Sequence, residues 1–458
     1  MAWKSISASH WQRPLGENER MIKWIGDRAL PAGREHWSVT AVGTFAVSSG
    51  SEPLASADLA SRLRRAWALL RFQHPSIAAV AGPDTLDYFV PDAAALAQWA
   101  DETLTVLATD TSASDVIARL QPSPYATGFF LPRTSQFVLH TSHWRTDGYG
   151  ILHLLDAFFG AVASDTDTTI LAWGDETARL APSIEHVLRL PAQPTAAVTA
   201  ETAACLATGR HIANSVGLPP KATATADTRP SGTRSVRHSI PADATSALLA
   251  ACRAHDILPL AAAHAALAAA NLATSPDGTH YTSTMRFSLR AHLPPPYDGA
   301  AGAAGLYTGG YMARADRGEP WAAHAAMYDG LYRAGVSDGF VQARREYAVQ
   351  ALRVVSQGAG LLRSEVDMSS VEDVDGIVEM RHGTGVGTGT GTGGVCVEVR
   401  DVSLGVECLA REAYLFYWIF RGKMEFDLVY NEAFYEGLFM EGFLDVLVGE
   451  LKKGLGVE

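Results

Sequence analysis

Residues 191–235 constrain the fold most, because they divide the chain into two halves that each contain strands and helices. This stretch is rich in Pro, Ala and Thr, and Pro219, Pro220 and Pro230 lie near its end. This composition and the positions of the prolines predict a helix within 198–216 followed by an extended crossover. We therefore expect an N-terminal lobe over 1–190, a linker over 191–235 and a C-terminal lobe over 236–458.

The first half contains one clear strand between two clear helices. Residues 56–74 carry Leu59, Leu63, Trp67 and Leu70 at helical spacing. Residues 135–143 are rich in strand-forming residues, and the apolar run 148–163 follows directly as a helix.

The second half mixes strands and helices in the same way. The residue patterns predict strands over 236–240, 280–289, 376–381 and 395–402, a strand–turn–strand unit over 414–430, and helices opening near 241 and over 258–272, 321–356 and 436–453. Two lobes, each a mixed sheet with covering helices, fit this order and define an α+β fold.

Charge and composition exclude several classes of function. The net charge is −12 with no basic run, which argues against nucleic-acid binding, since phosphate contacts need clustered Lys and Arg. The uncharged stretch 257–276 is mostly alanine and predicts a buried helix rather than a membrane span. The four cysteines form no CxxC pair, and charges in the first thirty residues fit no signal peptide. We therefore expect a cytoplasmic protein.

A glycine-rich stretch over 382–394 contains a formal GxGxxG at Gly389, Gly391 and Gly394. A dinucleotide site needs this motif between a strand and a helix. A strand-like run follows here, so a long loop between two strands is the better interpretation. The isolated His140, His153 and His264 are expected to be packing residues.

The segment HWRTDG, residues 143–148, carries the chemistry that the sequence predicts. It is an HxxxDG pattern at the end of a strand, just before a helix. A neutral imidazole at such a loop is suited to remove a proton from a hydroxyl or amine near neutral pH. Gly148 allows either a positive φ or a close backbone approach.

This segment resembles the active-site motif of the CoA-dependent acyltransferase superfamily, which includes chloramphenicol acetyltransferase, the BAHD acyltransferases and the condensation domains of nonribosomal peptide synthetases. Residues 290–296 (RAHLPPP) resemble the Arg-x-Arg-Leu-x-Pro-Pro segment of BAHD enzymes, and 401–405 (DVSLG) stand where those enzymes carry Asp-Phe-Gly-Trp-Gly. Residues 420–434 resemble the late strand and following helix of condensation-type proteins. The opening 11–16 (WQRPLG) is similar to that of fungal trichothecene 15-O-acetyltransferases.

The resemblance implies two chloramphenicol-acetyltransferase-like lobes with an active-site tunnel between them. It implies that His143 is the general base and that Asp147 is structural, either paired with Arg290 to fix the loop or acting as a simple turn or helix-start residue. Gly148 and Arg290 would support the motif. Ser403 and Gly405 would line the tunnel or stabilise an oxyanion, with a surface loop as the equal alternative.

The implied reaction transfers an acetyl group from acetyl-CoA, a co-substrate, to a hydroxyl of a secondary metabolite such as a trichothecene-like terpenoid or a polyketide. No permanently bound cofactor, metal, nucleic acid or membrane span is expected, and the chain is expected to be a monomer. Two alternatives stay open: a standalone condensation-type enzyme that uses a carrier-protein thioester, and a non-catalytic binding protein of the same fold. Ser142, where condensation domains usually have a second His, argues mildly against peptide-bond formation.

Overall fold

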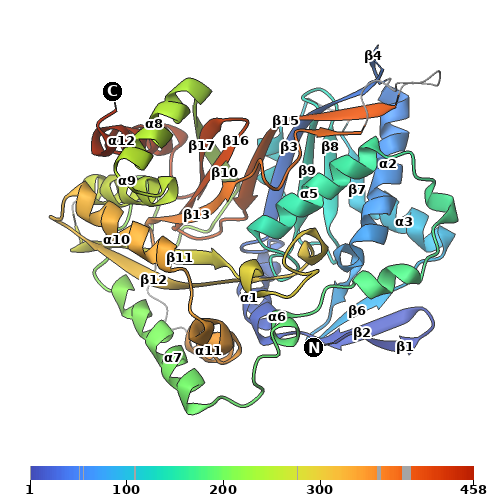
Figure 1. Cartoon of the computed structure of the whole chain (residues 1–458), viewed down its shortest axis with the longest axis horizontal. Helices are drawn as coiled ribbons and strands as arrows, with labels where there is room; N and C mark the ends of the chain where they lie inside the picture. Colours follow the sequence, from blue (N-terminus) through green and yellow to red (C-terminus); the bar gives the residue numbers. More distant parts are fainter. Residues whose placement is uncertain are drawn as a thin grey trace.

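The computed structural model describes residues 2–50, 52–54, 56–107, 110–275, 277–357, 363–383 and 394–457. Two lobes lie side by side, one built mainly from the first half of the chain and one mainly from the second (Figure 1). The fold class predicted from the sequence is confirmed. The formal GxGxxG pattern lies largely outside the described residues.

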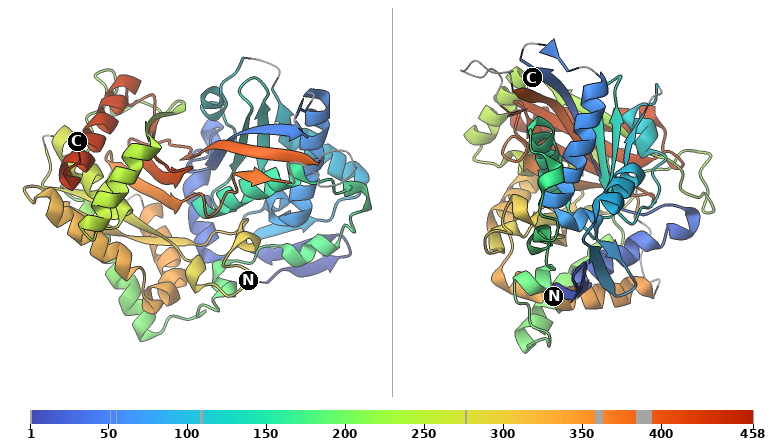
Figure 2. Two further views of the ribbon diagram at one scale, coloured as in Figure 1. Left: turned by 45° about the horizontal axis from the view of Figure 1, so that its top comes forward. Right: turned by 90° about the vertical axis from the view of Figure 1, so that its right-hand side faces the viewer.

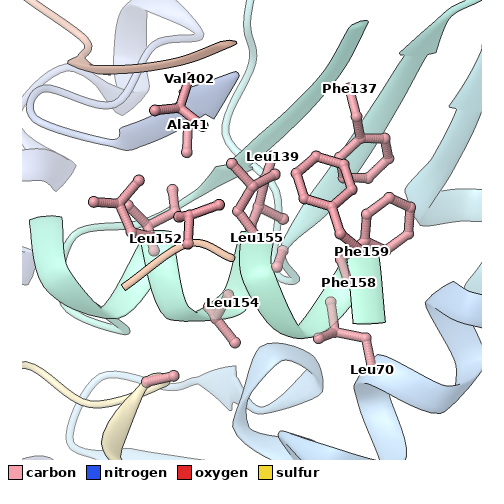
Figure 3. Packing of buried hydrophobic residues seen from close by; sticks show 14 of the residues in the cluster. Ala41, Leu70, Phe137, Leu139, Leu152, Leu154, Leu155, Phe158, Phe159 and Val402 are labelled. Atoms are coloured by element: carbon pink, nitrogen blue, oxygen red, sulfur yellow. The ribbon is translucent and has the colours of Figure 1, made fainter. Parts of the chain in front are cut away.

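The N-terminal lobe is organised around a seven-stranded sheet with the order β14-β15-β3-β9-β8-β7 and β4 paired to β3. These strands are β3 (Val39–Ser49), β4 (Glu52–Pro53), β7 (Leu104–Val106), β8 (Thr127–Leu131), β9 (Gln136–Thr141), β14 (Arg381–His382) and β15 (Val395–Val406). Helix α5 (Gly148–Ala163) contacts this sheet and α2 (Ser56–Gln73). Leu152 and Leu155 of α5 lie beneath Ala41 and Val402 of the sheet (Figure 3). This packing holds α5 across β3 and β15.

A smaller sheet with the order β1-β2-β6-β5 lies next to the N-terminus. Its strands are β1 (Lys4–Ser7), β2 (His10–Pro14), β5 (Val80–Ala81) and β6 (Thr85–Phe89). The N-terminal half also contains α1 (Glu17–Asp27), α3 (Ala93–Thr103), α4 (Ala113–Ile117) and α6 (Ile184–Val187).

The C-terminal lobe contains a four-stranded sheet, a hairpin and packed helices. The sheet has the order β10-β17-β16-β13, and β11 pairs with β12. The strands are β10 (Thr233–Ile240), β11 (His280–Ser288), β12 (Thr308–Asp316), β13 (Val366–Asp373), β16 (Ala413–Phe420) and β17 (Lys423–Asn431). The helices of this half are α7 (Ala196–Ala207), α8 (Ala242–Ala254), α9 (Pro259–Thr274), α10 (Trp321–Ala334), α11 (Asp338–Ser356) and α12 (Gly437–Leu455). The alanine-rich α9 is almost wholly buried against α10 and α12, as expected.

Strand pairing crosses between the two halves of the chain. The strand β15 comes from the second half but pairs antiparallel with β3 from Val395↔Ser49 to Val406↔Val39. The left view of Figure 2 shows this orange strand reaching across among the blue and cyan elements. The division into 1–190, 191–235 and 236–458 stays a prediction, and hydrogen bonding between strands does not follow it.

Two secondary-structure predictions for the second half are wrong. The segment 376–381 is not a strand apart from Arg381, which belongs to β14. Residues 374–378 form a helical turn, because Val374 and Val378 lie four apart and both pack into the core beside α5. The adjacent strand is β13, whose sequence VDMSSVED has a weak strand pattern. The predicted helix 321–356 is two helices, α10 and α11, separated at residues 335–337.

Candidate active site

His143 lies in the six-residue loop between β9 and α5. Its Nδ1 lies 2.9 Å from the backbone oxygen of Thr146. A carbonyl oxygen can only accept a hydrogen bond, so Nδ1 must carry the proton and donate it. The neutral ring therefore has its lone pair on Nε2, for which no hydrogen-bond partner is found among the described residues. This is the tautomer that a general base needs.

The surroundings of His143 keep the imidazole neutral. Burial lowers its pKa below the ordinary value of 6.5, and the charge of Arg286 lowers it further, whereas the Thr146 carbonyl and Asp147 act in the opposite direction. The side chain nevertheless remains partly exposed. A ring that is buried enough to lose basicity but still reachable by solvent can take a proton from a ligand at neutral pH.

Asp147 combines the two structural roles that the sequence left open. Its carboxylate accepts hydrogen bonds of 2.7 and 2.9 Å from Nη1 of Arg290, and both side chains are buried. It also caps α5 by accepting from the backbone N–H of Gly150 at 2.9 Å, and it accepts from the N–H of Tyr307 at 2.8 Å. The predicted ion pair is therefore present, together with the helix-start role. Asp147 thereby joins the loop of His143 to residues 290–307 of the second half.

Two glycines allow the helix start to pack closely. Gly148 has no positive φ, so of the two predicted reasons for glycine only close approach applies: an added Cβ would lie 3.3 Å from Cγ2 of Val371 on β13. Gly150 is tighter, since a Cβ there would lie 2.2 Å from both the Ala303 oxygen and Oγ1 of Thr146. Sequence reasoning missed Gly150, although a second glycine two residues after the motif was a visible signal.

Arg145 anchors the loop from within. Its guanidinium donates to the backbone oxygens of Ser76, Ala79 and Pro124 at 2.7–3.1 Å and lies 4.3 Å from the centre of the Trp144 ring. Burial lowers its pKa to about 10. The spacing of the motif gave no sign of this role.

Ser142 is fixed by a carboxylate from the segment before β3. Its hydroxyl donates to Oε2 of Glu35 at 3.0 Å, and burial raises the pKa of Glu35. Both sides of His143 in the chain, Ser142 and Trp144–Asp147, are thus held by buried contacts. The sequence could not indicate the Glu35 contact, because the two residues are far apart in the chain.

Ser403 and Gly405 lie in the C-terminal part of β15, opposite Val42 and Thr40 of β3. They line a small hollow together with Asp427 of β17, and because they belong to a strand they are not part of a surface loop. Burial raises the pKa of Asp427 to about 7. His143 does not line this hollow, and the tunnel and oxyanion roles of Ser403 and Gly405 remain predictions.

A second, more open hollow of about 500 Å³ lies on the C-terminal lobe. Its lining includes Lys221, Arg234, Tyr430, Glu432 and Glu436. Lys221 and Arg234 are paired with Glu436 and Glu432, respectively. This hollow also does not include His143, so the predicted tunnel between the lobes remains a prediction.

The packing histidines behave differently from His143. His140 is buried on β9 and lies 3.2 Å from the Thr127 hydroxyl, with its pKa lowered to about 4 by burial. His264 is fully buried in α9. No group of three or more His, Cys, Asp or Glu side chains that could hold a metal is found within the described ranges.

Within the part of the chain that the structure describes, no single helix is both long and apolar enough to cross a bilayer. The pair α8–α9 reaches the required length and composition only together, and it is bent by 98°.

Sequence comparison identifies a full-length relative. The chain is 44% identical to acetyltransferase pigO of Monascus ruber over all of this chain and 99% of that protein. It is 27% identical to O-acetyltransferase pigM of the same organism, over all of this chain and 88% of that protein. No family model matches the chain.

Structure comparison identifies the same fold in solved structures. The trichothecene 15-O-acetyltransferase TRI3 of Fusarium sporotrichioides superimposes with a TM-score of 0.80 at 16% identity, over 98% of this chain and 97% of that one. The condensation domain of the monacolin K polyketide synthase MokA has a TM-score of 0.61 at 12% identity, over 99% and 98% of the two chains.

The HxxxDG loop on this two-lobed fold and the full-length similarity to acetyltransferases thus define an acyltransferase. Within that class, the chain belongs to the family of acetyltransferases that includes pigO of Monascus ruber. The family resemblance expected from the sequence is confirmed, and the protein is an enzyme.

Proposed function

We propose that this enzyme is an acetyl-CoA-dependent O-acetyltransferase that acts on a hydroxyl group of a secondary metabolite, with His143 as general base. The observation that carries the proposal is the hydrogen bond from Nδ1 of His143 to the Thr146 carbonyl, because it leaves Nε2 as a free acceptor. The fixed position of Asp147 between Gly150 and Arg290 supports it, since a base must be held in one orientation.

In the proposed reaction, His143 transfers the proton while the acyl group moves from the thioester to the acceptor oxygen. Nε2 of His143 takes the proton of the acceptor hydroxyl as its oxygen forms a bond to the thioester carbonyl carbon, and the C=O electron pair moves to the carbonyl oxygen. Return of that pair re-forms C=O and breaks the C–S bond. His143 then gives its proton to the departing thiolate of CoA. General base catalysis of this kind contributes about 10²–10⁴-fold in rate.

Of the two acceptor classes expected from the sequence, a trichothecene-like terpenoid and a polyketide, the relatives favour the polyketide. One relative, 27% identical over 70% of this chain and 77% of its own, is an azaphilone biosynthesis cluster protein of Aspergillus terreus. We therefore extend the proposal to an azaphilone-type polyketide alcohol as acceptor. The similarity to TRI3, at 16% identity, supports the fold and not its substrate.

A carrier-protein thioester is the second candidate donor, favoured by the fold shared with condensation domains. Free acetyl-CoA is preferred because the relatives pigO and pigM are named as acetyltransferases. Position 142 also differs from condensation domains. They usually have a second histidine there, whereas this chain has a serine that donates to Glu35.

The test is thiol release from acetyl-CoA by the purified protein, with azaphilone alcohols as acceptors and product mass measured by mass spectrometry. We expect a product heavier by one acetyl group, and no such product with His143→Ala. The matched control is His238→Ala on β10, whose partly exposed ring has its Nδ1 3.7 Å from Oδ1 of Asp445. Product formed from an acetyl carrier protein but never from acetyl-CoA would contradict the proposal.

A further inference from the structure

The hollow beside Ser403 and Gly405 lies between the two lobes. Its lining comes from β3, β15 and α4 on the side of the N-terminal lobe and from β10 and β17 on the side of the C-terminal lobe. Figure 1 shows β10 and β17 beside β15 where the two lobes meet. The space is narrow, about 30 Å³, which is room for about two water molecules. A hollow of this size can hold one polar group of a ligand, but not a ring.

Asp427 is a buried carboxyl group that lines this hollow and has an oxygen without a partner. Only 5% of the residue is exposed, and no hydrogen-bond donor to its Oδ1 is found within the described residues. Burying a polar oxygen without a partner costs free energy. The unpaired oxygen therefore indicates that a donor from outside the protein completes this site.

A neighbouring cation does not supply the missing donor. Arg237 lies opposite Asp427 in the pairing of β10 with β17. Its guanidinium nevertheless donates to both carboxylate oxygens of Asp401, at 2.7 and 2.8 Å, and to Glu425 at 3.0 Å. Burial raises the pKa of Asp427 to about 7, against the charge of Arg237 and the hydroxyl of Ser235, and the charges of the other two carboxylates act in the same direction as burial. A buried carboxyl group with such a shifted pKa beside a hollow is typical of a ligand-binding or catalytic site.

Hydroxyl groups and a glycine complete the hollow. Ser403 of β15 and Thr40 of β3 contribute the hydroxyls. Gly405 keeps the space open, because an added Cβ would lie 3.1 Å from Oγ1 of Thr40 and 3.7 Å from Cγ2 of Val429. Ser403 and Gly405 are only half-buried, so the hollow can be reached from outside. A ligand hydroxyl suits this set, since it can donate to Oδ1 of Asp427 and accept from a serine or threonine hydroxyl.

Strand pairing limits how far the hollow lies from the loop of His143. Thr40 pairs directly with His140 of β9, so their Cα atoms are about 4.5–5.5 Å apart. His143 follows three residues later, which adds at most about 11 Å along the chain. The Cα atoms of Thr40 and His143 are therefore no more than about 16 Å apart. One elongated ligand can span such a distance, so Asp427 is suited to bind a part of the ligand away from the reacting atoms.

We propose that the hollow at Asp427 is a subsite for the acceptor and binds a second hydroxyl group of the alcohol, one that is not acetylated. This inference rests on the proposed function. The second hydroxyl donates to Oδ1 of Asp427 and accepts from the hydroxyl of Ser403. The subsite thereby selects diols and polyols over alcohols with a single hydroxyl group. Because the contact is the same in the ground state and in the transition state, it acts on KM for the acceptor and not on kcat.

The experiment uses a pair of azaphilone alcohols that differ only in a second hydroxyl group. We expect Asp427→Leu to raise KM for the diol by about 10–100-fold, with kcat, KM for acetyl-CoA and KM for the mono-alcohol nearly unchanged. Asp427→Asn keeps an acceptor oxygen and should recover part of this loss, and Ser403→Ala should raise KM for the diol by about 2–10-fold. The matched control is Ser239→Ala on β10, whose hydroxyl donates to Glu425 at 2.8 Å outside the lining of the hollow, and it should match wild type.

Thermal unfolding separates a binding role of Asp427 from a structural role. Asp427→Leu removes a buried oxygen that has no partner, so its melting temperature should equal or exceed that of wild type. A lower melting temperature with an unchanged preference for the diol would show a structural carboxylate and overturn the inference. Unchanged KM values in both Asp427→Leu and Ser403→Ala would also overturn it, since the hollow would then hold water only.

Calorimetric titration with the diol alone keeps this inference apart from the proposed function. If wild type transfers no acetyl group to either alcohol, the proposed function fails. Weaker binding of the diol by Asp427→Leu than by wild type would still support the subsite, whereas equal binding would overturn it. If acetyl transfer proceeds but Asp427→Leu weakens both alcohols equally, the proposed function stands and the subsite for a second hydroxyl group is wrong.

Discussion

His143 and His264 are both enclosed by protein, but the two rings differ in what their nitrogens contact. His264 lies 2.8 Å from the Tyr332 hydroxyl through Nδ1 and 2.6 Å from the Ser283 hydroxyl through Nε2, and its ring stacks on Tyr328 with centres 3.8 Å apart. His143 has one nitrogen bound to a backbone carbonyl and the other free of partners among the described residues. Burial alone therefore does not identify a reactive histidine, whereas an unoccupied nitrogen on a partly exposed ring does.

The largest expected effect comes from removing each ring in turn. His143→Ala should lower acetyl transfer by about 10²–10⁴-fold with unchanged unfolding, because the loop is held by Arg145 and Asp147. His264→Ala should lower the free energy of unfolding by about 2–4 kcal/mol and leave kcat of the folded protein unchanged. Steady-state kinetics and denaturant unfolding of both variants check this. The opposite pattern, with activity lost in His264→Ala, would remove the distinction between the two sites.

Asp147 sharpens the comparison because it holds the loop of His143, whereas the His264 ring has its own partners in Tyr332 and Ser283. Asp147→Asn leaves the Arg290 cation without its carboxylate in a buried site, so we expect a loss of about 3–5 kcal/mol in stability together with lower activity. Thermal unfolding and kcat should fall together. A lowered rate with an unchanged melting temperature would indicate a direct chemical role for Asp147 instead.

Gly150 and Gly148 test how closely the helix start must pack. Gly150→Ala forces a methyl group against the Ala303 carbonyl and should cost about 1–3 kcal/mol or more, while Gly148→Ala meets only the Val371 side chain and should cost less. Activity should follow stability in the same order. Equal effects of the two substitutions would show that Gly150 is not the tighter contact.

Acid provides the mildest perturbation of His264. Burial lowers its pKa from 6.5 to about 3, so the unfolded chain binds a proton there more readily than the folded protein. Stability from this group is complete above pH 6.5 and is lost as pH falls towards 3, with a slope of up to about 1.4 kcal/mol per pH unit. The unfolding free energy of His264→Gln should therefore depend less on pH in this range than that of wild type. Equal slopes would contradict the neutral, buried ring.

The sequence predicted the local elements around the site well, because their signals are local. The strand before His143 and the helix over 148–163 follow from residue type and periodicity, and the Asp147–Arg290 pair followed from the resemblance. The pairing of β15 with β3 could not be predicted, since strand register depends on a partner hundreds of residues away. The contacts of Glu35 and Arg145 were missed for the same reason.

The most direct test of the central claim is the pH dependence of kcat/KM for acetyl transfer between pH 5 and 9. With His143 as a neutral base whose pKa lies below 6.5, we predict a constant rate at neutral pH and a fall on the acidic side of that value. The residual activity of His143→Ala should lack this fall. An acidic limb that persists unchanged in His143→Ala, or its absence from wild type, would contradict the role of His143 as the base.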